Sequence, residues 1–265
     1  LAGNQPALGR YGAALAYMGL GLYGPAYDAL NVVTKSAGPS PVVTALLFDV
    51  IARGGAGTDV MAKASANAEA SSGDPDVWLG LARVCARMKD MPGERKALDR
   101  AFELAPDRVQ VLMQRSGYFE RQGDPVEAGK VYQRLAELLP DDPAVCNNLA
   151  YNILQTGGDA KRALDLAQQA HAKLTSNPRV LHTLGLAQLR TGNLEDGRKN
   201  LTIALEQQPA DPTILLDVGQ LLIAQEKADE GRKYIEMALL YAGQLGLKFD
   251  RRAEAEALLS RRPGA

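Results

Sequence analysis

The chain has 265 residues, enough for one large hydrophobic core or for an elongated array of repeats. Its 30 lysines and arginines nearly balance its 31 aspartates and glutamates, so the composition offers no basic field for nucleic acid or anionic lipid. No uninterrupted apolar run of about 18 residues occurs, so no segment is expected to span a membrane.

The N-terminal part of the sequence predicts two helical hairpins. Residues 1–6 precede the first amphipathic pattern, and we expect them to be frayed. Residues 7–40 and 41–74 each have room for two helices joined by a short turn. The second hairpin follows the pattern of the later segments least well, because Phe48 and Asn67 stand where a small residue is expected.

The middle of the chain predicts two further hairpins of the same length, 75–108 and 109–142. Each contains apolar residues at spacings of three and four, as in the run that includes Trp78. Pro106 and Pro140 are expected to end the second helix of each hairpin, because proline cannot continue a helix.

The next part of the sequence repeats most clearly. Gly185 and Gly219 lie 34 residues apart and are each preceded by an apolar residue. Small residues recur in phase on both helices of these hairpins, and they should let the paired backbones approach closely. They are Ala150, Gly185 and Gly219 on the first helices and Ala163, Gly197 and Gly231 on the second helices. The hairpins are 143–177, 178–211 and 212–245.

Residues 246–265 predict one more helix and a tail that cap the array. The apolar residues available to cover the last hairpin are Leu247, Phe249, Ala253, Ala257 and Leu258. As in the polar-backed terminal helix of a stack, the charged residues are expected to face water. They are Arg251, Arg252, Glu254, Arg261 and Arg262.

This shared pattern resembles that of the tetratricopeptide repeat (TPR) family, W-x2-L-G-x2-Y followed by A-x3-F and P. The Leu184-Gly185 pair, Ala204 and Pro209 stand at the matching places of one repeat. The resemblance implies an all-α fold, a right-handed α-solenoid of seven helix-turn-helix repeats with a C-terminal capping helix. The repeats are those given above: 7–40, 41–74, 75–108, 109–142, 143–177, 178–211 and 212–245.

The residues that could carry chemistry do not form a catalytic or metal-binding pattern. Cys85 and Cys146 lie two repeats apart, on the order of 20 Å, so we expect buried reduced thiols and not a disulfide. His171 and His182 lack cysteine or carboxylate neighbours at the spacing of zinc ligands. We therefore predict no catalytic residue, no metal, no cofactor and no enzyme activity.

In the family, the first helices of the repeats line a concave groove that binds peptides or helices of partner proteins. The corresponding positions here are Arg53, Arg83, Arg87, Asn147, Tyr151, Gln155, Arg179, His182, Arg190 and Gln220. Their arginines suggest a polar, moderately basic groove for an acidic or carboxylate-bearing segment. The alternative is that these arginines are only solvated, or paired with Asp49, Asp76 and Glu120.

The resemblance implies a non-catalytic scaffold for protein–protein interaction. The Ala-, Arg- and Gly-rich composition indicates a bacterial source, and general resemblance suggests envelope, pilus or polysaccharide-export assembly at the periplasm or outer membrane. The alternative is a cytoplasmic regulatory module that binds a signalling peptide. The near-neutral charge argues against nucleic acid as a partner.

Overall fold

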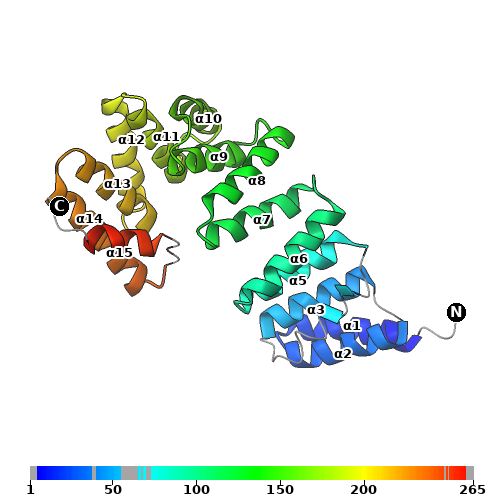
Figure 1. The fold of residues 1–265 in the computed structure, drawn as a ribbon. Helices are drawn as coiled ribbons and strands as arrows, with labels where there is room; N and C mark the ends of the chain where they lie inside the picture. Colours follow the sequence, from blue (N-terminus) through cyan, green and yellow to red (C-terminus); the bar gives the residue numbers. More distant parts are fainter. Residues whose placement is uncertain are drawn as a thin grey trace. The chain divides into compact units, whose positions relative to one another are not determined.

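Every regular element in the described part of the chain is an α-helix (Figure 1). The computed structural model describes residues 5–37, 40–54, 65, 66, 68, 69, 73–247, 249 and 251–260. The second helix expected in repeat 41–74 therefore lies largely outside the described residues, as do residues 1–4 and 261–265. No described helix combines the length and the apolar character needed to cross a bilayer.

Contacts between residues divide the chain into two compact units, Leu1–Arg115 and Ser116–Ala265. The helices of the N-terminal unit are α1 (Gln5–Gly19), α2 (Tyr23–Ala37), α3 (Pro41–Gly54), α5 (Pro75–Arg87), α6 (Met91–Leu104) and the first part of α7 (Val109–Arg121). The C-terminal unit contains the rest of α7 and the helices α8 (Pro125–Leu138), α9 (Pro143–Gln155), α10 (Ala160–Lys173), α11 (Pro178–Arg190), α12 (Leu194–Gln207), α13 (Pro212–Ala224), α14 (Ala228–Gln244) and α15 (Arg252–Ser260).

Within each unit, consecutive helices pack as antiparallel pairs, which confirms the predicted helical solenoid of stacked hairpins. The pairs α1–α2, α5–α6, α9–α10, α11–α12 and α13–α14 carry the densest packing. The limits of the individual repeats stay a prediction.

The closest approach of paired helices occurs at the predicted glycines. A Cβ atom built on Gly231 of α14 would lie 2.5 Å from the carbonyl oxygen of Gly219 on α13. A Cβ atom on Gly185 would lie 2.9 Å from the carbonyl oxygen of Gly197. Ala150 and Ala163, which stand at the same places in the preceding hairpin, are both fully buried. The repeated small residues therefore set how tightly each pair packs.

The turn between the two helices of a repeat contains one residue in the left-handed region. In the turn between α7 and α8, for example, this residue is Gly123, with φ of 67°. Two repeats place a side-chain-bearing residue there instead, Lys89 with φ of 58° and Glu226 with φ of 62°. The left-handed conformation costs such residues about 1–2 kcal/mol, so stacking must impose it on both turns.

The first helices begin with a cap that the sequence encodes directly. Asp142 accepts hydrogen bonds from the backbone N–H groups of Ala144 and Val145, at 2.9 and 3.0 Å. Pro143 follows it at the first position of the helix, where a missing N–H group has no cost. Asp142 is therefore the N-cap of α9.

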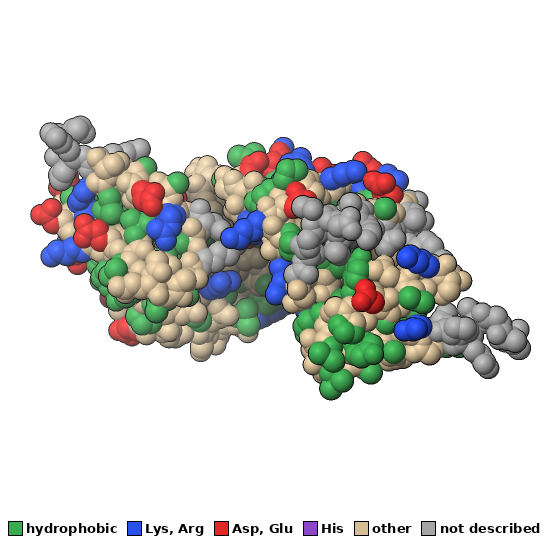
Figure 2. Space-filling view, turned by 90° about the horizontal axis from the view of Figure 1, so that it is seen from below, with side chains coloured by type: hydrophobic (Ala, Val, Ile, Leu, Met, Phe, Trp, Pro, Cys, Tyr) green, Lys and Arg blue, Asp and Glu red, His purple; other side chains and the backbone are tan. Residues whose placement is uncertain are grey.

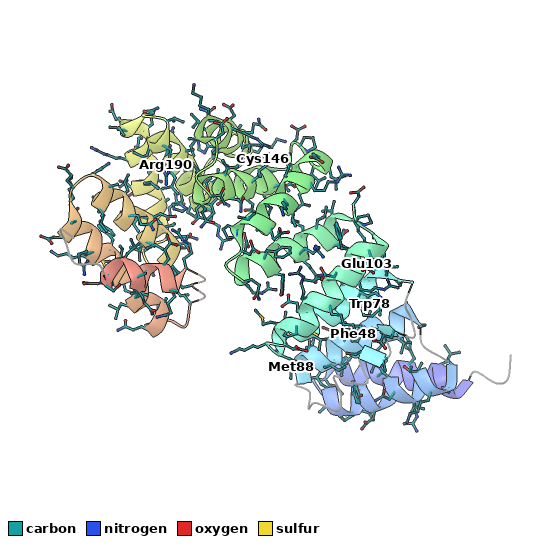
Figure 3. All side chains as sticks on the ribbon, viewed as in Figure 1. Phe48, Trp78, Met88, Glu103, Cys146 and Arg190 are labelled. Carbon is teal, nitrogen blue, oxygen red and sulfur yellow. The ribbon has the colours of Figure 1, made fainter. Side chains whose placement is uncertain are left out.

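Phe48 shows how the second repeat accommodates a large residue. The ring is 2% exposed and faces Gly80 of α5, where an added Cβ would lie 2.6 Å from ring atom Cδ2. Figure 3 shows Phe48 and Trp78 on the neighbouring helices α3 and α5. The absent side chain at residue 80 thus makes room for the ring at residue 48.

The surface of α1 and α2 carries exposed hydrophobic side chains, which gather at this end of the N-terminal unit in Figure 2. Leu8 and Leu20 are 70% and 73% exposed. The first helix pair therefore presents an apolar face that the described residues do not cover.

The C-terminal helix caps α14, as predicted, but with a different set of residues. Phe249 and Ala255 are buried in one cluster with Leu215 of α13 and Ile235 of α14. Leu258 packs at the edge of this cluster. The other three predicted contacts, Leu247, Ala253 and Ala257, are exposed.

Candidate binding hollow of the C-terminal unit

A hollow of about 700 Å³ opens among the first helices of the C-terminal unit. Its wall is formed by α9, α11 and the start of α13, together with the end of α7 and residues of the C-terminal segment. First helices supply most of the wall, and Pro125 and Ala128 at the start of α8 also line it.

A buried carboxylate lies behind this wall. Asp217 of α13 is 6% exposed, although it stands in an otherwise apolar helix. The Tyr151 hydroxyl of α9 donates a hydrogen bond to Asp217 Oδ2 at 3.0 Å. Arg251 Nη1 donates to Asp217 Oδ1 at 2.5 Å. Side chains that are 66 and 34 residues away in sequence thus converge on one carboxylate.

His182 of α11 completes the surroundings of this carboxylate. Its Nε2 atom lies 3.0 Å from Asp217 Oδ2, but its N–H bond is not aligned with that oxygen, so we interpret the contact as chiefly electrostatic. The imidazole ring also packs against the Tyr151 ring, with centroids 5.6 Å apart. Histidine and tyrosine therefore fix one side of the carboxylate and leave the other side to arginine.

The environment of Asp217 stabilises its charged form. Burial alone would raise the pKa of Asp217, but contact with His182 and the charge of Arg251 lower the pKa below its ordinary value. Burial, together with the nearby carboxylate, raises the pKa of the Tyr151 hydroxyl well above 10. The cluster is therefore an anion–cation pair with a neutral hydrogen-bonding tyrosine at neutral pH.

Arg251 makes hydrogen bonds with all three of its guanidinium nitrogens. Besides Asp217, Nη1 donates to the Tyr151 hydroxyl oxygen at 2.9 Å, and Nη2 donates to Gln220 Oε1 at 3.2 Å. Nε and Nη2 donate to the two Glu254 oxygens at 2.6 and 2.9 Å. The Arg251 side chain is 18% exposed, so the expectation that it faces water was wrong. Arg252 and Glu254 are exposed, as expected.

Five of the ten predicted groove residues line the hollow: Asn147, Tyr151, Gln155, Arg179 and His182. Gln220 joins them indirectly, through its hydrogen bonds with Arg251 and Glu254. Arg190 lies at the C-terminal end of α11 and is not among the lining residues (Figure 3). Arg53, Arg83 and Arg87 belong to the N-terminal unit.

The arginines of the N-terminal unit differ in their partners. Arg53 pairs with Asp49 at 2.9 Å, as the alternative interpretation expected. Asp76 pairs with Arg108, a residue outside the predicted set. Arg83 and Arg87 are exposed and form no ion pair with any described residue. Glu120, in the C-terminal unit, accepts a hydrogen bond from the Tyr132 hydroxyl and pairs with none of the predicted arginines.

Sequence reasoning missed the two residues at the centre of the cluster, Asp217 and Arg251. A signal was present, since Asp217 is the single charged residue in the run PTILLDVGQLLIA. A lone charge on an apolar helix has to find a partner when it is buried.

The two cysteines are free and buried, as predicted. Burial raises the pKa of the Cys85 thiol to about 12. The described residues contain no group of three or more histidines, cysteines or carboxylates that could hold a metal ion.

Comparison with known proteins agrees with this geometry. A family model described as "Tetratricopeptide repeat" matches residues 95–143 and 182–244. The chain therefore contains tetratricopeptide repeats. A TPR repeat-containing protein of Pseudomonas aeruginosa is 25% identical over 174 residues, which are 62% of this chain. This TPR chain spans 29% of the length of that relative.

Solved structures show the same fold. A tetratricopeptide repeat protein from Parabacteroides merdae covers 97% of this TPR chain and is itself covered completely, with a TM-score of 0.67 and 9% identity. The APC/C hetero-tetramer Cut9-Hcn1 covers 94% of the chain and is covered over 54% of its own, with a TM-score of 0.54 and 13% identity. At these identities the likeness concerns the fold alone.

Proposed function

We propose that this protein is a non-catalytic scaffold that holds a segment of a partner protein in the hollow of its C-terminal unit. The repeat fold is one that serves protein–protein interaction, and the hollow supplies a place for it. The observation that carries the proposal is Asn147, which lines the hollow with a buried side-chain oxygen that accepts no hydrogen bond. Its nitrogen makes only a long contact, 3.4 Å, with Asn148.

A buried amide oxygen that accepts no hydrogen bond is costly, and a partner's backbone N–H group would satisfy it. Gln155 and Arg179 stand beside it on the same wall and are exposed. An extended peptide or a helix entering the hollow would thus meet an acceptor at depth and polar side chains at the rim. This is the arrangement expected of a peptide groove.

The charge of the partner is proposed separately for each unit. Arg83 and Arg87 are available on α5 of the N-terminal unit and favour an acidic or carboxylate-bearing segment there. The hollow of the C-terminal unit is different, because the acidic residues that line it outnumber the arginines. The acidic residues are Glu120, Asp124, Asp211 and Glu254, and the arginines are Arg179 and Arg251.

We place this scaffold in bacterial envelope, pilus or polysaccharide-export assembly, at the periplasm or outer membrane. The second candidate is a cytoplasmic module that binds a regulatory peptide. Both use the same hollow and differ in the partner captured. A nucleic acid partner is not part of either proposal, because positive and negative charges balance.

Site-specific photo-crosslinking in the native cell tests the proposal. A benzophenone amino acid at Gln155, which lines the hollow, should crosslink one partner segment that mass spectrometry can identify. The matched control carries the same group at Lys199, which is exposed on α12 and does not line the hollow. Export or pilus subunits would support the first setting, and a sensor or transcription factor the second. Equal crosslinking from both positions, or none from Gln155, would refute binding in the hollow.

Charge reversal tests the N-terminal unit. The double variant Arg83→Glu/Arg87→Glu should weaken capture of an acidic partner at least ten-fold, whereas Arg53→Glu, whose partner is Asp49, should weaken it less. Unchanged binding by the double variant would contradict an acidic partner.

A further inference from the structure

We propose that Asp217, Tyr151 and Gln220 form a guanidinium-recognition site, which the chain fills with its own Arg251 and which an arginine-bearing partner segment occupies by displacing it. This inference rests on the proposed function, because it names the chemistry that the hollow of the C-terminal unit recognises. The C-terminal segment is then a built-in competitor for the site.

The first argument is the completeness of the coordination. A guanidinium carries five N–H groups in a fixed planar fork, and Arg251 makes five hydrogen bonds. Three of the acceptors, on Asp217, Tyr151 and Gln220, are fixed on α13 and α9, whereas Glu254 comes from the same segment as Arg251. A lysine has only three N–H groups and a different geometry, so it could not reproduce this set. The site is therefore selective for arginine.

The second argument is that the site can exist without Arg251. Two contacts of Asp217 do not involve Arg251, namely the Tyr151 hydroxyl at 3.0 Å and His182 Nε2 at 3.0 Å. These two contacts keep a buried carboxylate from being isolated. The vacated space is then an acceptor-rich pocket with a fixed negative charge, which attracts a cationic side chain.

The third argument is the weak hold on the segment that carries Arg251. Helix α15 has nine residues, too few for stability on its own, and Ala255 is its one buried residue. Apart from the arginine cluster, the segment is held by a hydrogen bond from Arg232 to the Leu259 carbonyl oxygen and by a few apolar side chains in the cluster with α13 and α14. These are Phe249, Ala255, Leu258 and Leu259. Arg251 therefore supplies most of the polar contacts that hold the segment.

The fourth argument is position. Arg251 and Glu254 line the same hollow as Asn147, whose side-chain oxygen is free. A partner segment that places an arginine against Asp217 would run along the hollow and could donate a backbone N–H group to Asn147. Recognition of the side chain and recognition of the backbone would then occur on one ligand.

The test uses a fluorescent synthetic peptide with the sequence of residues 246–260 as the probe, added to the full chain. The tethered segment competes at an effective concentration on the order of millimolar, so the wild type should bind the peptide weakly. The variant Arg251→Gln leaves the site vacant and should bind the peptide at least ten-fold more tightly. The neighbouring exposed Arg252→Gln variant is the matched control and should behave as the wild type.

Two further measurements make the result specific. A peptide in which the arginine at residue 251 is replaced by lysine should bind the Arg251→Gln protein at least ten-fold more weakly than the original peptide. The double variant Asp217→Asn/Arg251→Gln, which buries no unpaired charge, should lose the gain in binding. Equal peptide affinity of the wild type and Arg251→Gln, or equal affinity for the arginine and lysine peptides, would overturn the proposal.

The outcome is separable from that of the proposed function. Peptide binding by Arg251→Gln without any crosslink from Gln155 would support the guanidinium site and count against a partner in the hollow. A partner crosslinked equally by wild type and Arg251→Gln would support the scaffold and overturn the competition by Arg251.

Discussion

The substitution Gly231→Ala tests whether close helix contact holds the repeats together. The added Cβ atom would lie 2.5 Å from the Gly219 carbonyl oxygen and 3.0 Å from the Ile223 backbone nitrogen. Backbone atoms cannot rotate away, so α13 and α14 would have to separate. Overpacking of this kind costs about 1–3 kcal/mol.

The intrinsic preference of alanine for helix opposes this cost by about 1 kcal/mol. Gly243→Ala on the same helix supplies the matched control, because nothing lies within 4 Å of its added Cβ atom. The two variants make the same chemical change, so the difference between them isolates the clash. We expect Gly231→Ala to be less stable than Gly243→Ala by about 1–3 kcal/mol.

Urea unfolding followed by circular dichroism at the helical band measures this difference. The Gly243→Ala midpoint should equal or exceed that of the wild type, and the Gly231→Ala midpoint should fall below it. If both variants have the same urea midpoint, the backbone contact between α13 and α14 does not limit packing. The explanation that the repeated small residues set the distance between paired helices would then be wrong.

Three other predictions concern single sites. Lys89 and Gly123 both have left-handed backbone conformations. Lys89→Gly should therefore raise the free energy of unfolding and Gly123→Ala should lower it, each by about 1 kcal/mol. Urea midpoints that shift in the same direction for both variants would contradict this. Cys85, with a pKa of about 12, should react with iodoacetamide at pH 8 only as fast as the protein unfolds, and rapid labelling of the native protein would show that the thiol is accessible. The pKa of Asp217 is lowered in the folded state, so its pairing with Arg251 stabilises the protein at neutral pH. This stabilisation is lost as the pH falls below 3.8, the ordinary pKa of an aspartate. Asp217→Asn should therefore flatten the dependence of the melting temperature on acid pH.

The periodic features were predictable from the sequence because each is set by residues within one hairpin. The 34-residue spacing, the glycines between paired helices and the Asp142 cap depend on contacts that recur in several of the described repeats. Five of the ten predicted groove residues line the hollow, and they were predicted from the same 34-residue period. The size of Phe48 seemed to break the pattern because its compensating residue, Gly80, belongs to the next repeat.

The contact between Asp217 and Arg251 was not predictable in the same way. Charged residues on a short terminal helix normally face water, and nothing local to Arg251 distinguishes it from Arg252. The difference arises from where α15 places each side chain. One reaches a buried carboxylate, and the other reaches solvent.

The 34-residue period nevertheless explains the contact between Asp217 and Arg251 if α15 is counted as the first helix of a further repeat. Arg251 bonds Asp217 and Glu254 bonds Gln220, and in both cases the partners are 34 residues apart. These are equivalent positions on successive first helices, so the start of α15 stands where the first helix of a further repeat would stand. The wall of the hollow therefore continues onto the C-terminal segment. A segment that extends the wall also carries side chains into the proposed binding hollow, and Arg251 is the one that reaches a buried charge.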